Sequence, residues 1–230
     1  MGLKEDLNSE LGQIFTEKWD VQETTNIPDP DHLRLSNHAK KLAEATILYA
    51  DLDGSTSMVD NYKWWFSAEI YKAYLRCAAR IIKDKGGVIT AYDGDRIMAV
   101  FTGNAKNTNA VKAAMNINYA VIYIIRPLIK KHYPNTTFEL KHKIGIDCSE
   151  IYASRIGVRG SNDLVWVGRA ANYAAKLTTM SGKPLWITNT VFNKLANEAK
   201  YSEGVLMWDE KVWSAMNNMK IYCSNYHWSF

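Results

Sequence analysis

The sequence predicts an α+β fold in which an antiparallel sheet carries helices on one face. Short apolar runs typical of strands alternate with longer segments of helical periodicity, and Asp93-Gly94 joins two of the runs as a hairpin. The elements follow in the order strand, helix, strand, strand, helix, strand, which is the ferredoxin-like split arrangement. A chain of 230 residues that is 47% apolar is long enough for one such domain.

The elements can be assigned in chain order. Residues 3–19 have the apolar spacing of an amphipathic helix, residues 24–31 contain two prolines and read as a linker or extended arm, and residues 36–44 form a polar lead-in. We therefore divide the chain into an N-terminal helix and arm, 1–43, and a main domain, 44–230. The main domain is expected to contain a strand at 46–51, helices within 56–85 stopped by Gly86-Gly87, a hairpin at 88–101, a helix at 105–131, strands at 141–148 and 150–156, an irregular glycine-rich loop at 157–162, a strand at 163–167, a helix at 169–180, a strand at 184–188, a helix at 189–199 and a closing hairpin within 205–223.

Composition excludes several classes of function. The net charge of +4 is modest and its cations are scattered, so we expect no nucleic-acid partner. Three well-separated cysteines read as free thiols of a reducing, cytoplasmic compartment. The N-terminus is polar and acidic where a signal peptide would be basic and then apolar, and the longest apolar run, 119–125, is too short to span a bilayer. We therefore expect a cytoplasmic protein without a membrane partner.

Two aspartates are the strongest pointers to chemistry. Asp51 ends an apolar strand and is followed by Gly54, and Asp95 follows the hairpin turn at Gly94. Carboxylates at strand ends beside glycine present oxygen ligands to hard cations, and the turn amides beside them can approach phosphates. The alternative is that Asp51 caps a helix and that Asp93-Gly94 is only a turn. Taken together, the two positions favour metal-assisted phosphoryl chemistry.

A third motif lies at 163–177, where a strand, a turn at Gly168 and a helix follow one another. Asn172 and Lys176 are one turn apart on the same face of this helix. An amide and a cation in that position can contact a sugar oxygen and a phosphate. In isolation, the same pair would read as solvated residues on a surface helix.

The ordered segments 50–56, 93–101, 144–147 and 167–176 together resemble the class III nucleotide cyclase domain, over roughly residues 44–225. The resemblance implies that Asp51 and Asp95 are the metal aspartates and that the carbonyl of Leu52 is a further metal ligand. It also implies that Asn172 orients the sugar and that Lys176 occupies the place of a transition-state arginine. The family's cofactors are two divalent ions per site, Mn2+ or Mg2+. Its members form head-to-tail homodimers whose composite active sites take residues from both chains.

The base-recognition positions depart from the purine cyclases. Relatives that make cyclic AMP carry a lysine where this chain has Ala91 and an aspartate or threonine where it has Val165, so purine selection is disfavoured. The wider context at 45–60 and 89–101 resembles the pyrimidine cyclases of bacterial anti-phage Pycsar systems, which convert UTP or CTP to the 3',5'-cyclic monophosphate. UTP is thus the expected substrate, with CTP as the alternative, and a separate effector protein gated by the cyclic nucleotide is the expected reader of the product. A lysine at 176 supplies a compact ammonium charge, whereas an arginine would supply a planar guanidinium group that can donate two parallel hydrogen bonds.

The remaining contacts to the nucleotide are expected at two places. The triphosphate is assigned to the amides of Asp53, Gly54, Ser55 and Thr56, and the base to a pocket formed by Tyr49, Ala91, Tyr92, Arg96 and Val165. Two other readings remain open: an adenylate or guanylate cyclase with an unusual pocket, and an inactive nucleotide-binding regulator. A palm-type diguanylate cyclase fits poorly, because the hairpin reads Tyr-Asp-Gly-Asp-Arg where that class has a Gly-Gly-Asp-Glu-Phe-like turn.

Overall fold

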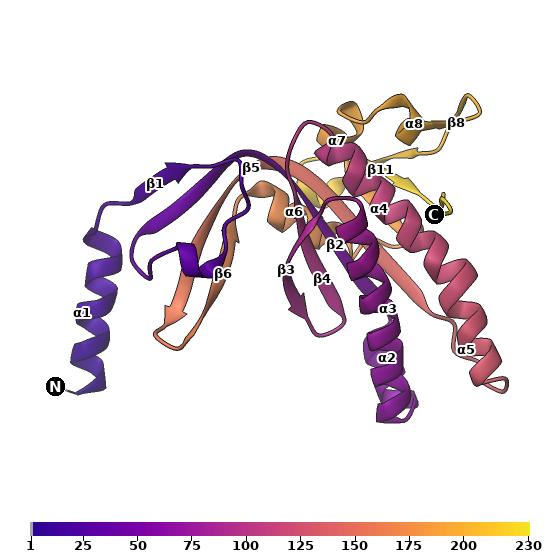
Figure 1. The fold of residues 1–230 in the computed structure, drawn as a ribbon, viewed down its shortest axis with the longest axis horizontal. Coiled ribbons are helices and arrows are strands. Elements are labelled where there is room, and N and C mark those ends of the chain that lie inside the picture. Colours follow the sequence, from indigo (N-terminus) through magenta and orange to yellow (C-terminus); the bar gives the residue numbers. More distant parts are fainter. Residues whose placement is uncertain (1) are drawn as a thin grey trace.

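The computed structural model describes residues 2–230, and within them most strands join one sheet. Its order is β10-β11-β7-β5-β2-β4-β3, with β1 paired to β2 and β6 paired to β5 (Figure 1). Neighbours are antiparallel except for the parallel pairs β1–β2 and β5–β7. The strands are β1 (Asp20–Glu23), β2 (His38–Asp53), β3 (Val88–Asp93), β4 (Arg96–Phe101), β5 (Lys141–Val158), β6 (Ser161–Val167), β7 (Leu185–Thr188), β10 (Asp209–Trp213) and β11 (Met219–Ser224), and β8 (Tyr201–Ser202) pairs with β9 (Val205–Leu206) separately. The predicted α+β class with a mainly antiparallel sheet is confirmed.

The two central strands, β2 and β5, are much longer than predicted. Residues 36–44 are not a lead-in, because β2 already begins at His38, and the strands expected at 141–148 and 150–156 are one continuous β5. The lysines at 40 and 41 misled the prediction, because a polar pair does not look like a strand, yet both are half-buried in β2 and Leu42 beside them is buried. A bulge between Leu42 and Ala45 absorbs the change of register.

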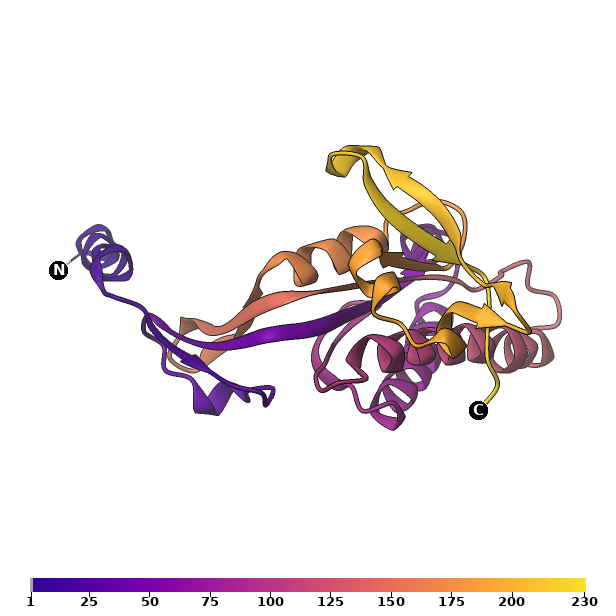
Figure 2. The ribbon, with the colours of Figure 1, turned by 90° about the horizontal axis from the view of Figure 1, so that it is seen from above.

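The expected loop at 157–162 is also wrong, because β5 and β6 continue to the pair Val158–Ser161. The glycine at 160, with φ +84°, allows the tight turn between them. Together, β2, β5 and β6 form a ribbon that extends well beyond the body of the molecule (Figure 2).

One face of the sheet carries the large helices. α3 (Trp64–Asp84) and α4 (Lys106–Ala120) pack over Leu48, Ala50 and Ile146, and α2 (Ser55–Asn61) precedes α3. The single helix expected at 105–131 is interrupted by a π-helical turn, η2 (Val121–Ile125), before α5 (Arg126–His132). Pro127 explains the interruption, since it has no N–H to donate to the preceding turn.

The opposite face carries α6 (Arg169–Leu177), which the expectation of helices on one face did not include. α6 packs with Ile47 and Ile151, whose side chains alternate with those that face α3 and α4. It lies against Gly145, where an added Cβ would overlap the carbonyl oxygen of Ala174 and come 2.7 Å from the Leu177 Cβ. The glycine therefore sets how closely α6 approaches the sheet.

The C-terminal part completes the sheet edge. The helix expected at 189–199 is split into α7 (Asn189–Asn193) and α8 (Asn197–Lys200), and the closing hairpin forms from β10 and β11, joined through the 3-10 turn η3 (Ser214–Met216). β11 pairs with β7 and so fastens the hairpin to the sheet.

The N-terminal segment is an arm attached to the far end of the ribbon. α1 (Leu3–Thr16) ends before the predicted limit of 19, β1 follows and pairs with β2, and a short turn, η1 (Pro30–His32), lies within the expected linker. The expected division between 43 and 44 falls inside β2, so the arm is continuous with the sheet. No helix in residues 2–230 combines the length and apolar character that crossing a membrane would require.

The close approach of α6 gives a prediction on stability. We expect Gly145→Ala to lower the free energy of unfolding by roughly 1–3 kcal/mol or more, because the new methyl meets backbone atoms that no side-chain rotation can clear. Urea unfolding of the purified variant measures this. Gly12→Ala is the control, since a Cβ at Gly12 meets nothing within 4 Å. Equal stability of Gly145→Ala and the parent would show that α6 can move away at little cost.

Candidate active site

The antiparallel pairing of β2 and β4 brings two predicted metal ligands to one edge of the sheet. Ala50 on β2 pairs with Ile97 on β4, so Asp51 lies just past this pair on one strand while Asp95 lies just before β4 on the other. Leu52 is the next residue of β2, and its side chain is buried in the core. Residues separated by more than forty positions in sequence thus meet where β2 ends and β4 begins (Figure 1).

The electrostatics show that the two carboxylates act on each other. The pKa of Asp51 is raised to about 6, first by burial and then by the negative charge of Asp95. The Oδ2 atom of Asp95 is buried and has no hydrogen-bond partner in the described part of the chain. An orphaned oxygen and a repelled carboxylate are what a bound cation would satisfy, so the residues present fit the divalent ions that the sequence resemblance implies.

Few protein groups are available to hold a cation at this place. Across residues 2–230, no three His, Cys, Asp or Glu side chains are grouped as a metal-binding cage. Magnesium and manganese are commonly held by one or two carboxylates together with substrate phosphates and water. Asp51 and Asp95, with the Leu52 carbonyl beside them, match that pattern better than the closed ligand set of a structural metal.

Neutral groups support this strand end from the helix side. The buried Tyr74 hydroxyl lies 3.4 Å from the carbonyl oxygen of Asp51 and 3.4 Å from Nδ1 of His142. Nε2 of His142 lies 3.0 Å from Oδ1 of Asn118. Burial lowers the pKa of the His142 ring to about 3, so the ring stays neutral. None of these groups offsets the charge of the carboxylates.

The expected phosphate turn lies directly after Asp51. α2 begins at Ser55 rather than near Ser57, so the amides of Ser55 and Thr56 belong to its first turn, where no earlier helical carbonyl accepts them. Gly54, at φ +84°, makes the turn from β2 into α2, and Asp53 is exposed at the end of β2. Residues 53–56 therefore follow Asp51 and Leu52 without a break in the chain.

Sequence reasoning missed Lys143. It pairs with Asp51 across β2 and β5, is only 7% exposed, and donates from Nζ to the carbonyl of Gly182 at 2.6 Å. Its Nζ lies 3.9 Å from the carboxylate of Asp53, and burial lowers its pKa. The sequence could have indicated a buried lysine here, because Lys143 directly precedes the apolar Ile144 in a strand whose other residues are mostly apolar.

Part of the predicted base pocket is assembled in one chain. Tyr49 on β2 pairs with Met98 on β4, which in turn pairs with Ala91 on β3. The Arg96 guanidinium lies over the Tyr49 ring, 5.3 Å from its centre, and donates to Asp93 at 2.7 Å. Tyr49 lies two residues before Asp51 and therefore on the same face. Met98, which lies between the two predicted residues, was not anticipated.

Two predicted pocket residues lie elsewhere within one chain. Tyr92 is 58% exposed, and as the neighbour of Ala91 on β3 it points to the other face. Leu164 and Trp166 pack in the cluster that Tyr49 and Ala91 also contact, so alternation along β6 turns Val165 away from it. Within one chain, Tyr92 and Val165 therefore do not lie on the same side as Tyr49 and Ala91.

Asn172 and Lys176 do not meet the carboxylates within one chain. Both are exposed on the outer side of α6, whereas Ala170, Ala171 and Ala174 face the sheet. In residues 2–230 their side chains contact only nearby groups: the Asn172 amide lies 3.5 Å from the carbonyl of Gly168, and the Lys176 Nζ lies 3.9 Å from the sulfur of Met216.

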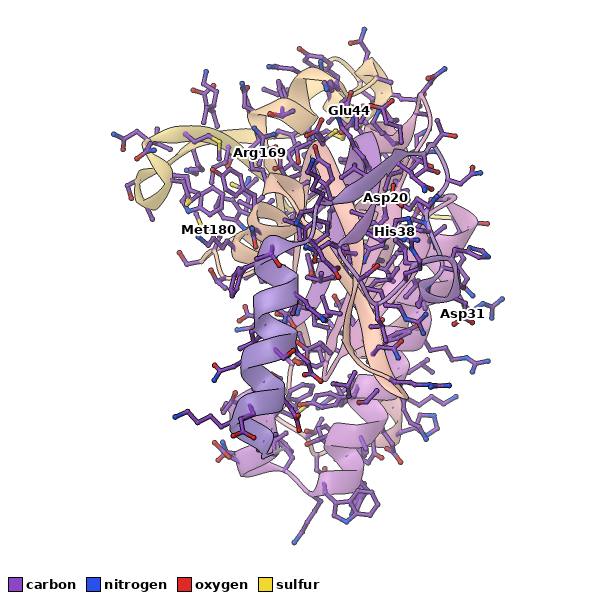
Figure 3. The ribbon with its side chains drawn as sticks, turned by 90° about the vertical axis from the view of Figure 1, so that its left-hand side faces the viewer. Asp20, Asp31, His38, Glu44, Arg169 and Met180 are labelled. Carbon is purple, nitrogen blue, oxygen red and sulfur yellow. The ribbon has the colours of Figure 1, made fainter. Side chains whose placement is uncertain are left out.

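The start of α6 is fixed by an ion pair to a buried carboxylate that the sequence did not reveal. Arg169 donates from Nε to the fully buried carboxylate of Asp147 at 3.1 Å and from NH2 to the Cys148 carbonyl at 2.7 Å (the labelled Arg169 in Figure 3). The hydroxyl of Thr188 on β7 donates to the same carboxylate. These contacts hold α6, and with it Asn172, at a defined position on the sheet.

Comparison with known proteins identifies the family. No family model matches the chain. It is 58% identical over 230 residues, all of both chains, to a uridylate cyclase of Burkholderia cepacia, and 52% identical to one of Xanthomonas perforans over 99% of each chain. The chain belongs to the uridylate cyclase family. A third uridylate cyclase, of a Rhodovulum species, is 34% identical and covers 98% of this chain and 97% of its own.

Solved structures show the fold of this uridylate cyclase family member to be that of class III nucleotide cyclases, as the sequence resemblance predicted. The adenylyl cyclase CyaB of P. aeruginosa matches with a TM-score of 0.69 at 19% identity, over 81% of this chain and 95% of its own. The guanylyl cyclase Cya2 matches with a TM-score of 0.67 at 18% identity, over 80% and 91%. These structures show the fold, and the uridylate cyclase relatives described above show that the chain is a nucleotide cyclase.

The raised pKa of Asp51 gives a prediction on stability and pH. Because the folded chain holds the proton on Asp51 more tightly than the unfolded chain does, stability is lost as the pH rises through about 6. We expect Asp51→Asn to melt at a higher temperature than the parent at pH 7.5 in EDTA. This gain should shrink below pH 6 and disappear only at about pH 3.5, below the ordinary aspartate pKa of 3.8, where the parent carboxyl is protonated in the unfolded chain too. Differential scanning calorimetry at the two pH values measures it.

Asp60→Asn is the matched control for this comparison, since Asp60 is an exposed carboxylate on α2. Asp60→Asn should have the same melting temperature as the parent at both pH values. A lower melting temperature for Asp51→Asn at pH 7.5 would contradict the repulsion described above.

Proposed function

We propose that this enzyme converts UTP to 3',5'-cyclic UMP and pyrophosphate. The observation that carries the proposal is the pair Asp51 and Asp95, which share one sheet edge with an orphaned carboxylate oxygen and the ring of Tyr49 on the same face. The uridylate cyclase names of relatives that match over their whole length support UTP over other nucleotides.

In the proposed reaction, the ribose 3'-hydroxyl attacks the α-phosphorus in line and pyrophosphate leaves. Asp51, Asp95 and the carbonyl of Leu52 would hold two divalent ions, Mn2+ or Mg2+. Such ions, when bound, acidify the attacking hydroxyl and neutralise the triphosphate. The protein itself mainly positions the two reacting groups, which is the main requirement of phosphoryl transfer.

The chain's other residues bind and orient the nucleotide. The amides of Asp53 to Thr56 would donate to the β- and γ-phosphates, with the buried cation of Lys143 behind the turn. Asn172 would orient the ribose and Lys176 would balance charge that develops on the phosphate. Because neither reaches the carboxylates of its own chain, we assign them to the site of a second copy in a homodimer.

The base would lie against Tyr49, Met98 and Ala91. Arg96 lies over the Tyr49 ring, and burial raises the pKa of the Tyr49 hydroxyl, so the ring is neutral and restrained. A restrained aromatic ring occupies space that the second ring of a purine would need. Ala91 offers no side-chain donor where cyclases specific for ATP carry a lysine.

By the same resemblance, we propose that cyclic UMP serves as a second messenger in anti-phage defence. A separate effector protein gated by the cyclic nucleotide would detect it.

A four-nucleotide assay tests the substrate. We expect UTP with Mn2+ to give cyclic UMP, and CTP, ATP and GTP to give far less product, measured by mass spectrometry.

Asp51→Asn and Asp95→Asn should each lose about 100-fold or more of the activity, or roughly 2.7 kcal/mol of transition-state stabilisation, since the two carboxylates share the ions. Tyr49→Ala should change the ratios among UTP, CTP and ATP, and unchanged ratios would remove Tyr49 from the pocket. Turnover of CTP above UTP would make the enzyme a cytidylate cyclase.

Mixing two inactive variants tests the composite site. Asp95→Asn and Asn172→Ala chains, each inactive alone, should recover about a quarter of parental activity when mixed in equal amounts and allowed to exchange. Half of the dimers then contain both variants, and each of these has one intact site of two. Failure of the mixture to recover activity, with exchange demonstrated by native mass spectrometry, would mean that each chain supplies its whole site.

A further inference from the structure

α1 has an apolar stripe that nothing in its own chain covers. Leu3, Leu7, Leu11 and Ile14 fall within an arc of roughly 80° at 3.6 residues per turn, and they are 76, 44, 48 and 52% exposed. The helix buries none of its residues. A helix of 14 residues is marginal in water unless packing supports it, so α1 needs a surface to lie on.

The stripe is held out from the body rather than left on a flexible linker. The side-chain amide of Asn37 donates to the carbonyls of Ile14 at 2.7 Å and Glu17 at 2.8 Å, and β1 pairs in register with β2. Both ribbon views place α1 beyond the end of the ribbon, away from α3 and α4 (Figures 1 and 2). Figure 3, drawn from this side, shows α1 in front with no other helix lying on it.

A groove beside the helix extends this surface. A cavity of about 620 Å3 separates α1 from the tip of the β5–β6 hairpin. Ile14 belongs both to the stripe and to the groove, and the groove continues across Ile156 and Val158, which are 52 and 67% exposed. Apolar surface of this extent on one side of an arm is typical of a protein interface.

The charge of α1 indicates which surface covers it. Leu3–Thr16 carries three carboxylates, Glu5, Asp6 and Glu10, against Lys4 alone, whereas the whole chain has a net charge of +4. The body of a second copy is therefore basic and complementary to the acidic helix. Helices that lie on membranes carry lysine and arginine on their polar face, so an anionic bilayer fits poorly.

A second copy is also what the split site requires. Asn172 and Lys176 need a neighbouring chain to reach the carboxylate pair, so two copies already have to be in contact. We propose that the apolar stripe of α1 packs on the body of a second copy of this chain and holds together the dimer in which the composite sites form. This rests on the proposed function only in assigning catalysis to that dimer. By two-fold symmetry, each copy donates one α1 and receives one.

The double substitution Leu7→Asp with Leu11→Asp tests the proposal on the full chain. Two charges on the stripe should raise the dimer dissociation constant by about 100-fold or more, measured by analytical ultracentrifugation, since apolar packing is replaced by buried charge. The variant should still unfold cooperatively, and it should melt with the parent at dilutions where the parent is also monomeric, because α1 buries nothing in its own chain. Cyclase activity per chain should fall at low protein concentration and return as the concentration is raised. Ser9→Asp, on the opposite side of the helix, is the matched control and should behave as the parent.

Each other outcome has a defined meaning. Parental dimerisation by the Leu7→Asp, Leu11→Asp chain overturns the proposal, as does a parent chain that stays monomeric at all concentrations. Binding of the parent to anionic phosphatidylserine vesicles that the double variant loses would also overturn it, in favour of a membrane. A loss of dimerisation with unchanged activity per chain supports the interface and contradicts the composite site. A loss of dimerisation in a protein that makes no cyclic UMP supports the interface and contradicts the proposed substrate.

Discussion

The rest of the structure depends on the antiparallel pairing of β2 and β5. Their ladder runs from Ala39 opposite Ser154 to Asp53 opposite Lys141, with one bulge. One end of this ribbon carries Asp51 and the turn into α2, the middle carries Gly145 beneath α6, and the far end carries β1 and α1. A single register therefore fixes the distance between the carboxylate edge, the helix with Asn172 and the exposed arm, because a slip of one residue would move every side chain to the other face.

The candidate active site is built around charge that the chain leaves unbalanced. Asp51 and Asp95 repel each other, and Tyr74 and His142 behind them are neutral. Lys143 is a nearby cation, but its Nζ is turned to the carbonyl of Gly182 and to the phosphate turn. The charge must therefore be balanced from the solvent side, where divalent ions and a triphosphate would arrive together. This arrangement stores an unfavourable interaction in the free enzyme that binding relieves.

The proposed dimer would cover two features that one chain leaves exposed. Asn172 and Lys176 present an amide and a cation to solvent, and the stripe of α1 presents apolar surface to solvent. Both are tied to the sheet, the first by the ion pair of Arg169 with the buried Asp147 and the second by hydrogen bonds from Asn37. Rigid groups without a partner in their own chain are what a symmetric dimer uses, since ordering them costs little when a second copy arrives.

The sequence by itself determined the fold class, the hairpin at Asp93-Gly94, the stop at Gly86-Gly87, the helix of Asn172 and the family, because turn chemistry, periodicity and ordered motifs are local properties. It could not give the length of β2 and β5, since polar residues such as Lys40, Lys41 and Glu150 interrupt the apolar pattern of strands that continue through them. Nor could it show that Tyr92 and Val165 turn away from Tyr49 and Ala91 within one chain, or that Met98 and Lys143 pair with Tyr49 and Asp51. Only the tertiary structure decided these points, because which face a residue occupies and which strand lies beside it depend on sheet register, and register is set by contacts between segments far apart in the chain.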